Sequence, residues 1–499
     1  MNKTDSQETN FILLPVTGVS IRAEGNPEVV SFVEILNEYA KAKSRFKLSA
    51  ITVPPDPQND FEIKVVDSIN DHGAKLIRMN DEHLADLRFS YPGLRILPET
   101  FFNLQVYKRK SVEVKVKRRD VNNVIPVCIT NQNGEPIEGI TVVAFTDHYI
   151  RKGASGISNA KGIVKLKLNT SKVERLYVYA NHSYWGIYRK NFTLTPLFSI
   201  KLNAISTDYK DSLRYFYNTN KWPIIKNKVR VGVIDTGIGP HSDLQVAGGK
   251  NLVADERDDD YFDNGEGHGT HVGGIIAASG KIRGVAEGVE LMSYRVFPKG
   301  RAASNFDIMK AIHQAIEDDC HLINMSFGEI TMDEGLVAYI NEAYNKGILC
   351  FAANGNENSS TVNFPAAHSL TIAVSAMGRK GTFPARSAQT GNIKSPFGSD
   401  PKNFIADFSN VGPETDLTAP GVGIISTYPN NLYAVMDGTS MSCPAAIGLA
   451  ARLLAERPDL LQMPQIQRRA DEITKYFAKY IRRMGFGASY EGNGMLFTY

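Results

Sequence analysis

Cysteine is scarce in this chain, and long hydrophobic runs are absent from it. Four of the 499 residues are cysteines, and they lie far apart, without the close spacing typical of a metal site. We interpret them as free thiols of a reduced compartment: Cys128, Cys320, Cys350 and Cys443. No stretch approaches the roughly 20 apolar residues that a membrane-spanning helix needs, so the sequence argues against an integral membrane protein.

An excess of one charge is also absent. The formal net charge of +3 is too close to balance to indicate a nucleic acid or an anionic membrane as partner. With 42% hydrophobic and 22% charged residues, the composition is that of a globular protein, and its length predicts about three domains. The first twenty residues lack the basic start and long apolar core of a secretory signal. We therefore expect a cytoplasmic protein, with non-classical export left open.

The first two regions differ in their hydrophobic pattern. Residues 1–110 mix a helix over 27–42 and a second around 84–89 with short strands, and we expect an α+β domain of order βαββαβ. The strands are expected near 11–14, 46–53, 61–69, 74–79 and 94–98. Residues 111–205 alternate apolar with charged positions, which predicts an all-β sandwich of about seven strands. We expect a linker over 206–225.

From residue 226 to residue 499 the pattern changes to strongly apolar runs separated by helical segments. Runs of this kind suit strands that are covered on both faces, and their alternation with helices predicts an α/β domain with a parallel sheet flanked by helices. The expected strands cover 229–234, 291–297, 322–327, 348–353 and 370–376, and the expected helices cover 306–316 and 336–344. Residues 378–405, rich in Gly, Pro and Ser, read as a surface insertion.

Three polar residues stand where apolar segments begin or end. Asp235 closes a predicted strand, His268 opens a helix of small residues, and Ser440 opens a long helix that tolerates Pro444 in its first turn. Acyl transfer requires these three types: a serine nucleophile, a histidine base and a carboxylate that orients the histidine. Asn356, at the end of another buried strand, could donate to the oxyanion. Each residue alone is more often a cap or a turn former.

The sequence motifs around these residues resemble those of the subtilisin-like serine proteases. The resemblance covers about residues 226–499, and its order Asp, His, Ser is one of the known orders of this triad. It rests on the motifs Asp235-Thr236-Gly237, His268-Gly269-Thr270-His271 and Gly438-Thr439-Ser440-Met441. It implies a serine endopeptidase with Asp235, His268 and Ser440 as catalytic residues. It also implies that Asn356 is the oxyanion donor, that Ser326, Phe327 and Gly328 pair with the substrate, that Asn363 lies at the specificity pocket, and that His271 is a core residue.

Similar reasoning extends to the other regions. Residues 1–110 resemble the inhibitory propeptide of that family, so we expect polypeptide substrates and an N-terminal domain that acts as an intramolecular inhibitor. Residues 111–205 resemble carboxypeptidase-regulatory-like sandwiches, a likeness that carries no function. We expect no cofactor and no metal: Asp243 lies near a frequent calcium ligand of the family, but the loop 278–283 is too short to complete that site. Calcium is possible but not predicted.

Charge patterns add two expectations. The acidic stretch of residues 254–267 should approach the subsites before the scissile bond and attract basic side chains. Basic clusters at 108–110 and 117–119 should then be cut by the protease itself, between about residues 107 and 120. Asn363 should disfavour large aromatic residues in the specificity pocket.

Two other functions stay open at this point: an inactive pseudoprotease whose sandwich recruits partners, and an esterase or peptide ligase that uses the same triad.

Overall fold

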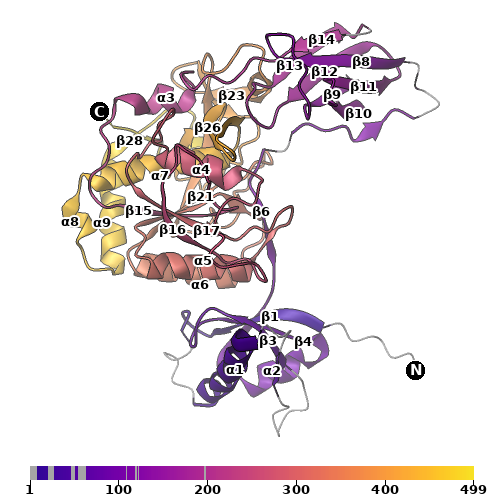
Figure 1. Cartoon of the computed structure of the whole chain (residues 1–499). Coiled ribbons are helices and arrows are strands. Elements are labelled where there is room, and N and C mark those ends of the chain that lie inside the picture. The colour runs from indigo at the N-terminus through magenta and orange to yellow at the C-terminus, as the bar shows by residue number, and fades with distance from the viewer. Residues whose placement is uncertain are drawn as a thin grey trace, which may run out of the picture.

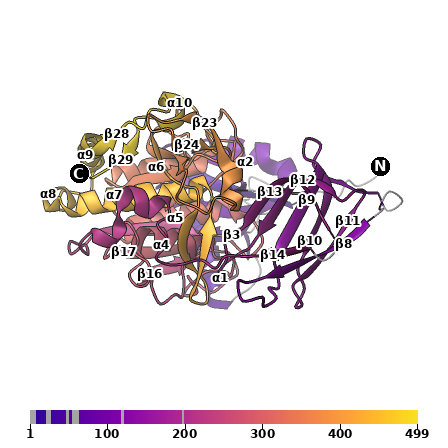
Figure 2. The same ribbon diagram turned by 90° about the horizontal axis from the view of Figure 1, so that it is seen from above.

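The computed structural model describes residues 8–20, 27–46, 51–53, 63–107, 109–117, 121, 123–195 and 198–498. The chain forms three bodies (Figure 1): a small α+β unit below, a large α/β unit above it, and an elongated β-sandwich beside the large unit, formed by the residues between the other two. Seen from above, the sandwich extends from one side of the α/β unit (Figure 2). Within the described residues, no helix is long and apolar enough to cross a membrane.

The N-terminal unit is a five-stranded sheet of order β2-β3-β4-β1-β5 with two helices. All five strands expected in this region are present, so the order is βαβββαβ and not βαββαβ; the second strand, β2, has three residues and pairs with β3 at the edge of the sheet. Residues 47–50 of the strand expected over 46–53, and residues 61–62 of the strand expected over 61–69, lie outside the described residues. The elements are β1 (Glu8–Pro15), α1 (Pro27–Phe46), β2 (Ile51–Val53), β3 (Ile63–Ser68), β4 (Lys75–Asn80), α2 (Leu84–Ser90) and β5 (Leu94–Pro98).

Both faces of this sheet are buried, which explains the unbroken apolar run Phe11–Leu14 in β1. Successive side chains of a strand point to opposite faces. Phe11 and Leu13 pack with helix α1 in the core of the unit itself, whereas Ile12 and Leu14 join a cluster with the large unit. In that cluster they meet residues of α5 (Asn305–Glu317) and α6 (Glu334–Asn345). The N-terminal sheet therefore lies on two helices of the α/β unit (Figure 1).

The middle unit is an all-β sandwich, as the alternating pattern predicted. One sheet has the order β13-β12-β9-β10-β7 and the other β11-β8-β14. Val164, Leu166 and Leu168 are buried between the sheets, and the lysines that alternate with them are exposed. The strands are β7 (Val114–Lys115), β8 (Asn123–Thr130), β9 (Thr141–Asp147), β10 (Lys152–Ile157), β11 (Ile163–Leu168), β12 (Lys172–Tyr179), β13 (Ile187–Thr193) and β14 (Phe198–Lys201).

The segment expected as a linker contains helix α3 (Ser212–Tyr217), which belongs to the core of the large unit. Leu213 and Tyr217 are buried in the same hydrophobic cluster as the main sheet. Asp211 caps the helix by accepting from the Arg214 amide, and its other oxygen accepts from the Arg214 guanidinium at 2.6 Å. A buried ion pair thus fixes the point where the chain enters the α/β unit.

The large unit is built on a twisted sheet of order β16-β17-β15-β19-β21-β22-β24-β23, with β25 also paired to β22. Pairing is parallel from β16 through β22 and to β25, as expected. The strands are β15 (Arg230–Asp235), β16 (Val246–Asn251), β17 (Glu290–Arg295), β19 (Leu322–Met325), β21 (Leu349–Ala353), β22 (Thr371–Arg379), β23 (Ile393–Phe397), β24 (Asn403–Ala406) and β25 (Leu417–Pro420).

Helices cover both faces of this sheet, and short ribbons surround it (Figure 1). Helices α4 (His268–Ala277) and α7 (Thr439–Ala455) share one core cluster, and α5 and α6 share the other. The remaining elements are β6 (Phe101–Leu104), β18 (Ala303–Ser304), β20 (Phe327–Gly328), β26 (Ile424–Tyr428), β27 (Leu432–Met436), α8 (Pro458–Leu461), α9 (Gln467–Phe477), β28 (Ile481–Arg482), α10 (Ala488–Glu491) and β29 (Met495–Leu496).

The expectation of a surface loop over 378–405 is wrong. Strands β23 and β24 lie within it and extend the main sheet in antiparallel fashion. Phe383 and Phe404 are buried beside Ala376 and Val422, so the segment contributes to a core despite its content of Gly, Pro and Ser.

Candidate active site

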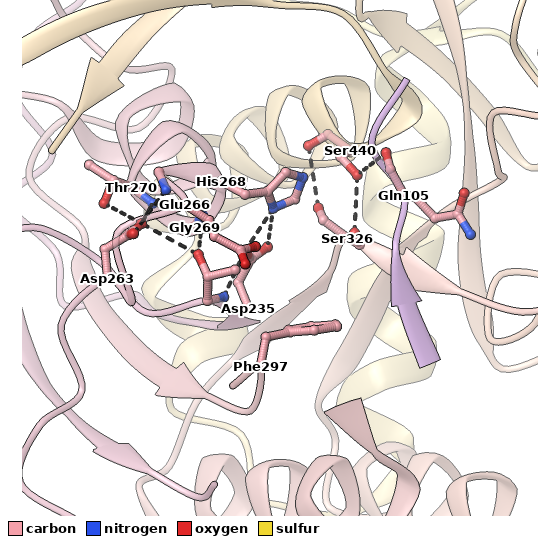
Figure 3. Close-up of polar contacts among 12 residues, drawn as sticks. Gln105, Asp235, Asp263, Glu266, His268, Gly269, Thr270, Phe297, Ser326 and Ser440 are labelled. Carbon is pink, nitrogen blue, oxygen red and sulfur yellow. Dashed lines mark hydrogen bonds and ion pairs between the residues drawn. The ribbon is translucent and has the colours of Figure 1, made fainter. Parts of the chain in front are cut away.

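The three polar residues singled out in the sequence meet at one end of the sheet (Figure 3). Asp235 ends strand β15, and its Oδ1 and Oδ2 lie 2.7 and 3.0 Å from Nδ1 of His268, the first residue of α4. The helix can approach this closely because residue 269 is glycine: a Cβ there would lie 2.2 Å from the carbonyl oxygen of Gly237. Sequence position alone placed both residues at element ends, and the structure brings them into contact.

Burial and charge oppose each other at His268. Burial by itself lowers the pKa of the imidazole, but the Asp235 carboxylate favours the protonated form by its charge and its hydrogen bond, and the net result is a raised pKa. Nε2 of His268 has no hydrogen-bond partner among the described residues. This nitrogen is therefore free to take up a proton.

A second group of contacts, not found by sequence reasoning, holds this pair in place. Asp263 accepts hydrogen bonds from the hydroxyl and amide of Thr270 in helix α4 and from the amides of Gly265 and Gly267. The hydroxyl of Thr236 accepts from the amide of Gly269 at 2.9 Å. The residues that follow the aspartate and the histidine in each motif thus fix the relative positions of β15 and α4.

Ser440 is the second residue of helix α7, and its side chain is fully buried in the intact chain. Pro444 lies inside the helix and not in its first turn, which corrects the expectation from the sequence. A proline has no N–H to donate to the carbonyl four residues earlier. That carbonyl belongs to Ser440, and it accepts from the hydroxyl of Ser326 at 3.3 Å.

A segment of the chain itself fills the site. Strand β6 lies between β18 and β20 as the central strand of a three-stranded antiparallel sheet. Leu104 pairs with Phe327 and Asn103 with Gly328, while the amide of Gln105 donates to the carbonyl of Ser326. The segment that leaves the N-terminal unit is therefore held in extended form against the strand predicted to pair with substrate.

The carbonyl of Gln105 lies beside the Ser440 side chain (Figure 3). The Ser440 hydroxyl donates to its oxygen at 2.7 Å, and the side-chain amide of Asn356 donates to the same oxygen. Asn356 is oriented by its own Oδ1, which accepts from the amide and hydroxyl of Thr439. One peptide carbonyl thus faces a hydroxyl and an amide donor beside a buried histidine.

The Gln105 side chain is also enclosed. Its Nε2 donates to the carbonyl of Gly328 at 2.7 Å, and the residue is 4% exposed. Asn363 and Glu357 line the same groove, and the Glu357 carboxylate accepts from the side-chain amides of Asn363 and Asn410. The pocket for this side chain is polar. The sequence marked Asn363 but not Glu357 or Gln105.

Two other residues named in the sequence analysis, His271 and Asp243, have structural contacts. His271 is buried, and its Nε2 contacts the carbonyl oxygens of Ile424 and Ala434, at 3.1 and 3.3 Å. Burial lowers its pKa to about 3, so the ring stays neutral. The carboxylate of Asp243 accepts from the Tyr433 hydroxyl and the Ile282 amide. In the described part of the chain, no three His, Cys, Asp or Glu side chains are grouped as metal ligands.

The acidic stretch, which we expected to approach the subsites before the scissile bond, has most of its carboxylates elsewhere or paired. Glu256 and Asp260 pair with Arg295, and Asp259 pairs with Arg257. Asp255, Glu256 and Asp258 line a different hollow, beside residues 65–69 of the N-terminal unit. Of the acidic residues in this stretch, Glu266 lines the active-site groove.

Comparison with known proteins agrees with this geometry. Residues 226–476 match the model of the subtilase family, and the chain belongs to that family. It is 34% identical over 276 residues to a thermostable alkaline protease of Halalkalibacterium halodurans, covering 55% of this chain and 67% of the relative. It is 36% identical over 240 residues to subtilisin DY of Bacillus licheniformis, covering 46% and 78%.

A further relative is the minor extracellular protease Epr of Bacillus subtilis, 34% identical over 234 residues, which are 46% of this chain and 32% of the relative. The chain is thus a subtilisin-like serine endopeptidase with an Asp-His-Ser triad, as the motifs predicted.

Proposed function

We propose that this endopeptidase is restrained by its own N-terminal unit and releases itself by cutting the bond between Gln105 and Val106. One observation carries the proposal: the carbonyl of Gln105 lies between the Ser440 hydroxyl and the Asn356 amide. The cut is thereby assigned to a bond just before the range 107–120 that the basic clusters suggested. Within those clusters, residues 108, 118 and 119 lie outside the described residues.

The chemistry follows from the contacts. Ser440 Oγ attacks the carbonyl carbon of Gln105 and passes its proton to Nε2 of His268, whose imidazolium Asp235 stabilises. The oxygen of Gln105 becomes an oxyanion and accepts from Nδ2 of Asn356. When the carbon–nitrogen bond breaks, His268 returns the proton to the amine of Val106. Water then hydrolyses the acyl-enzyme, with His268 again as base, and releases the carboxylate of Gln105.

Restraint by the N-terminal unit is supported by contacts of residues that precede β6 and by the packing of β6 itself. Asp67 accepts from Lys310 of α5 at 2.7 Å, and Thr100 donates to Asp333 at 2.8 Å. Phe102 is buried against the rings of Phe327 and Phe364. Because the same strand fills the groove that a substrate strand would need, the intact chain excludes other polypeptides. Ser326, Phe327, Gly328 and Asn363 then act as substrate-binding residues.

A fluorophosphonate probe tests this proposal. We expect the probe to label Ser440 in chains cut after Gln105 and to leave uncut chains unlabelled, because β6 covers the serine. The Ser440→Ala chain should stay uncut and unlabelled. Absence of labelling in the wild type, both with and without residues 1–110, would favour an inactive pseudoprotease instead. Labelling of the uncut chain to the same extent would contradict the restraint.

The main reaction and the cellular location are also predictions. Transfer of the acyl group to an amine or hydrolysis of esters would use the same triad, and peptide hydrolysis is proposed as the main reaction because the bound segment is a peptide. The cytoplasmic location rests on the sequence. The printed name of one relative, an extracellular protease, makes export the competing location, which fractionation of expressing cells would distinguish.

A further inference from the structure

The chain does not turn away from the active site after Gln105. Val106, Tyr107 and Arg109 line a groove of about 880 Å³ whose other walls come from two different units. The α/β unit contributes His268, Tyr428 and Asp437, among others. The sandwich contributes the end of β12 and the loop that follows it, residues 179–186. On the side after the scissile bond, the sandwich is therefore one wall of the substrate groove.

Tyr107, the second residue after the scissile bond, lies in an apolar recess. Its ring centroid is 4.8 Å from that of Phe408, and the side chain packs against a buried cluster of the α/β unit. Trp185, a residue of the sandwich, is part of the same cluster and 3% exposed. An aromatic ring at this position fills a space that both units form together.

Arg109, the fourth residue after the scissile bond, is bound by the sandwich. Its guanidinium donates to Oδ1 of Asn181 at 2.8 Å and to the carbonyl of Ala180 at 3.0 Å, and it lies 5.3 Å from the centre of the Tyr179 ring. The planar fork of an arginine can satisfy both acceptors at once, which a lysine cannot. The Asp437 carboxylate lines the same groove and adds a negative charge.

This wall is fixed to the α/β unit by backbone contacts. The amide of Ser183 donates to the carbonyl of Tyr433 at 2.8 Å, the amide of Ala388 donates to Gly186 at 3.2 Å, and the amide of Tyr188 donates to Arg386 at 2.9 Å. Hydrogen bonds of this kind, together with buried Trp185, hold residues 179–186 at a defined distance from Ser440. The sandwich is thus more than a spacer between the propeptide-like unit and the protease.

We infer that the sandwich is a specificity element of the protease: it forms the binding site for the substrate residues that follow the scissile bond. It selects polypeptides with an aromatic residue at the second position after the cut and an arginine at the fourth. The inference rests on the proposed function, since the scissile bond defines these positions. After the cut, Val106–Lys110 stays joined to the sandwich and competes with substrates for the same groove.

The test compares peptides on the wild-type chain after it has cut itself. The reference peptide has the sequence of residues 101–110, and two variants replace its tyrosine or its arginine by alanine. The tethered segment competes equally with all three peptides, so the ratios of kcat/KM report the groove itself. We expect each variant peptide to lose about tenfold in kcat/KM, the size typical of losing a charge-assisted hydrogen bond or a buried ring.

Two enzyme variants locate the effect. In Asn181→Ala, the loss caused by removing the peptide's arginine should shrink from about tenfold to about threefold, since one of the two acceptors of the guanidinium is gone. Asn133→Ala, an exposed asparagine in a turn of the same sandwich, should retain the tenfold loss.

Cleavage of the three peptides at equal kcat/KM would overturn the inference, as would an undiminished loss in Asn181→Ala. Failure of the wild-type chain to cut itself would be a different result, because it would overturn the proposed self-cleavage on which the inference rests.

Discussion

The hydroxyl of Ser440 lies 2.7 Å from the carbonyl oxygen of Gln105, a residue 335 positions earlier in the chain. This contact joins the nucleophile to one particular peptide bond of the same molecule. Since Asn356 donates to the same oxygen and β18 and β20 hold the preceding residues, the intact chain has the arrangement of an enzyme with its substrate. The bond that is cut and the groove that later substrates enter are therefore defined by one segment.

The side-chain amide of Asn356 should stabilise the oxyanion. We expect Asn356→Ala to lower kcat for a chromogenic peptide by about 10²–10³, with KM little changed, because the lost hydrogen bond is strongest in the transition state. Self-cleavage should slow by a similar factor. Asn345→Ala, an exposed residue on α6, serves as the control. Full activity of Asn356→Ala would contradict the assignment.

The pocket for the residue before the scissile bond should prefer glutamine. In Gln105→Glu, a carboxylate would face the carbonyl of Gly328 and lie in a pocket that Glu357 also lines. Two acceptors cannot form a hydrogen bond, so we expect self-cleavage to slow by about tenfold or more. Gln105→Met, of similar length and neutral, should slow it less. Electrophoresis over time measures both, and a strong preference for Phe or Tyr in a peptide library would contradict a polar pocket.

Activity should fall at acid pH, and the midpoint of this fall should lie above the ordinary pKa of histidine. His268 acts as a base in its neutral form, and its pKa is raised because Asp235 outweighs the effect of burial. Activity should therefore increase as pH rises through a midpoint above about 6.5. The pH profile of kcat/KM for a peptide substrate measures this midpoint. A midpoint at or below about 6 would mean that burial outweighs the carboxylate.

The buried pair of Asp211 and Arg214 should matter for stability. In Asp211→Ala, the guanidinium and the amides of Arg214 and Ile425 would lose their acceptor. Removing one partner of a buried ion pair costs about 3–5 kcal/mol of unfolding free energy. We expect a clearly lower thermal midpoint by calorimetry, whereas Asp208→Ala, at an exposed position nearby, should leave it unchanged. Equal midpoints would show that the pair is dispensable.

The sequence predicted the parts of the site whose signals are local. Asp235, His268, Ser440 and Asn356 each follow or open a strongly patterned element, and strand ends of a parallel sheet meet at one edge. The position of Gln105 has no such signal, because β6 finds its partners about 200 residues away, at residues 303–304 and 327–328. The pattern of neighbouring residues cannot specify a contact between segments so far apart in the sequence.

Other differences have physical causes of the same kind. The acidic stretch reads as one surface, but its charges are divided among Arg257, Arg295 and the backbone near Asp263. Residues 378–405 read as a loop because turn formers outnumber apolar residues, yet two buried phenylalanines suffice to attach them to the sheet. The sequence assigns no function to the sandwich, because that function depends on which of its residues face the groove.

N-terminal sequencing of the purified wild-type chain, beside the Ser440→Ala chain, tests the central claim most directly. The account predicts that the wild type carries a new N-terminus at Val106 and that Ser440→Ala carries none there, because the carbonyl of Gln105 lies against the Ser440 hydroxyl. A new N-terminus within 107–120 or 205–225 would contradict it. So would a wild-type chain that hydrolyses peptides at its full rate while the bond between Gln105 and Val106 stays intact.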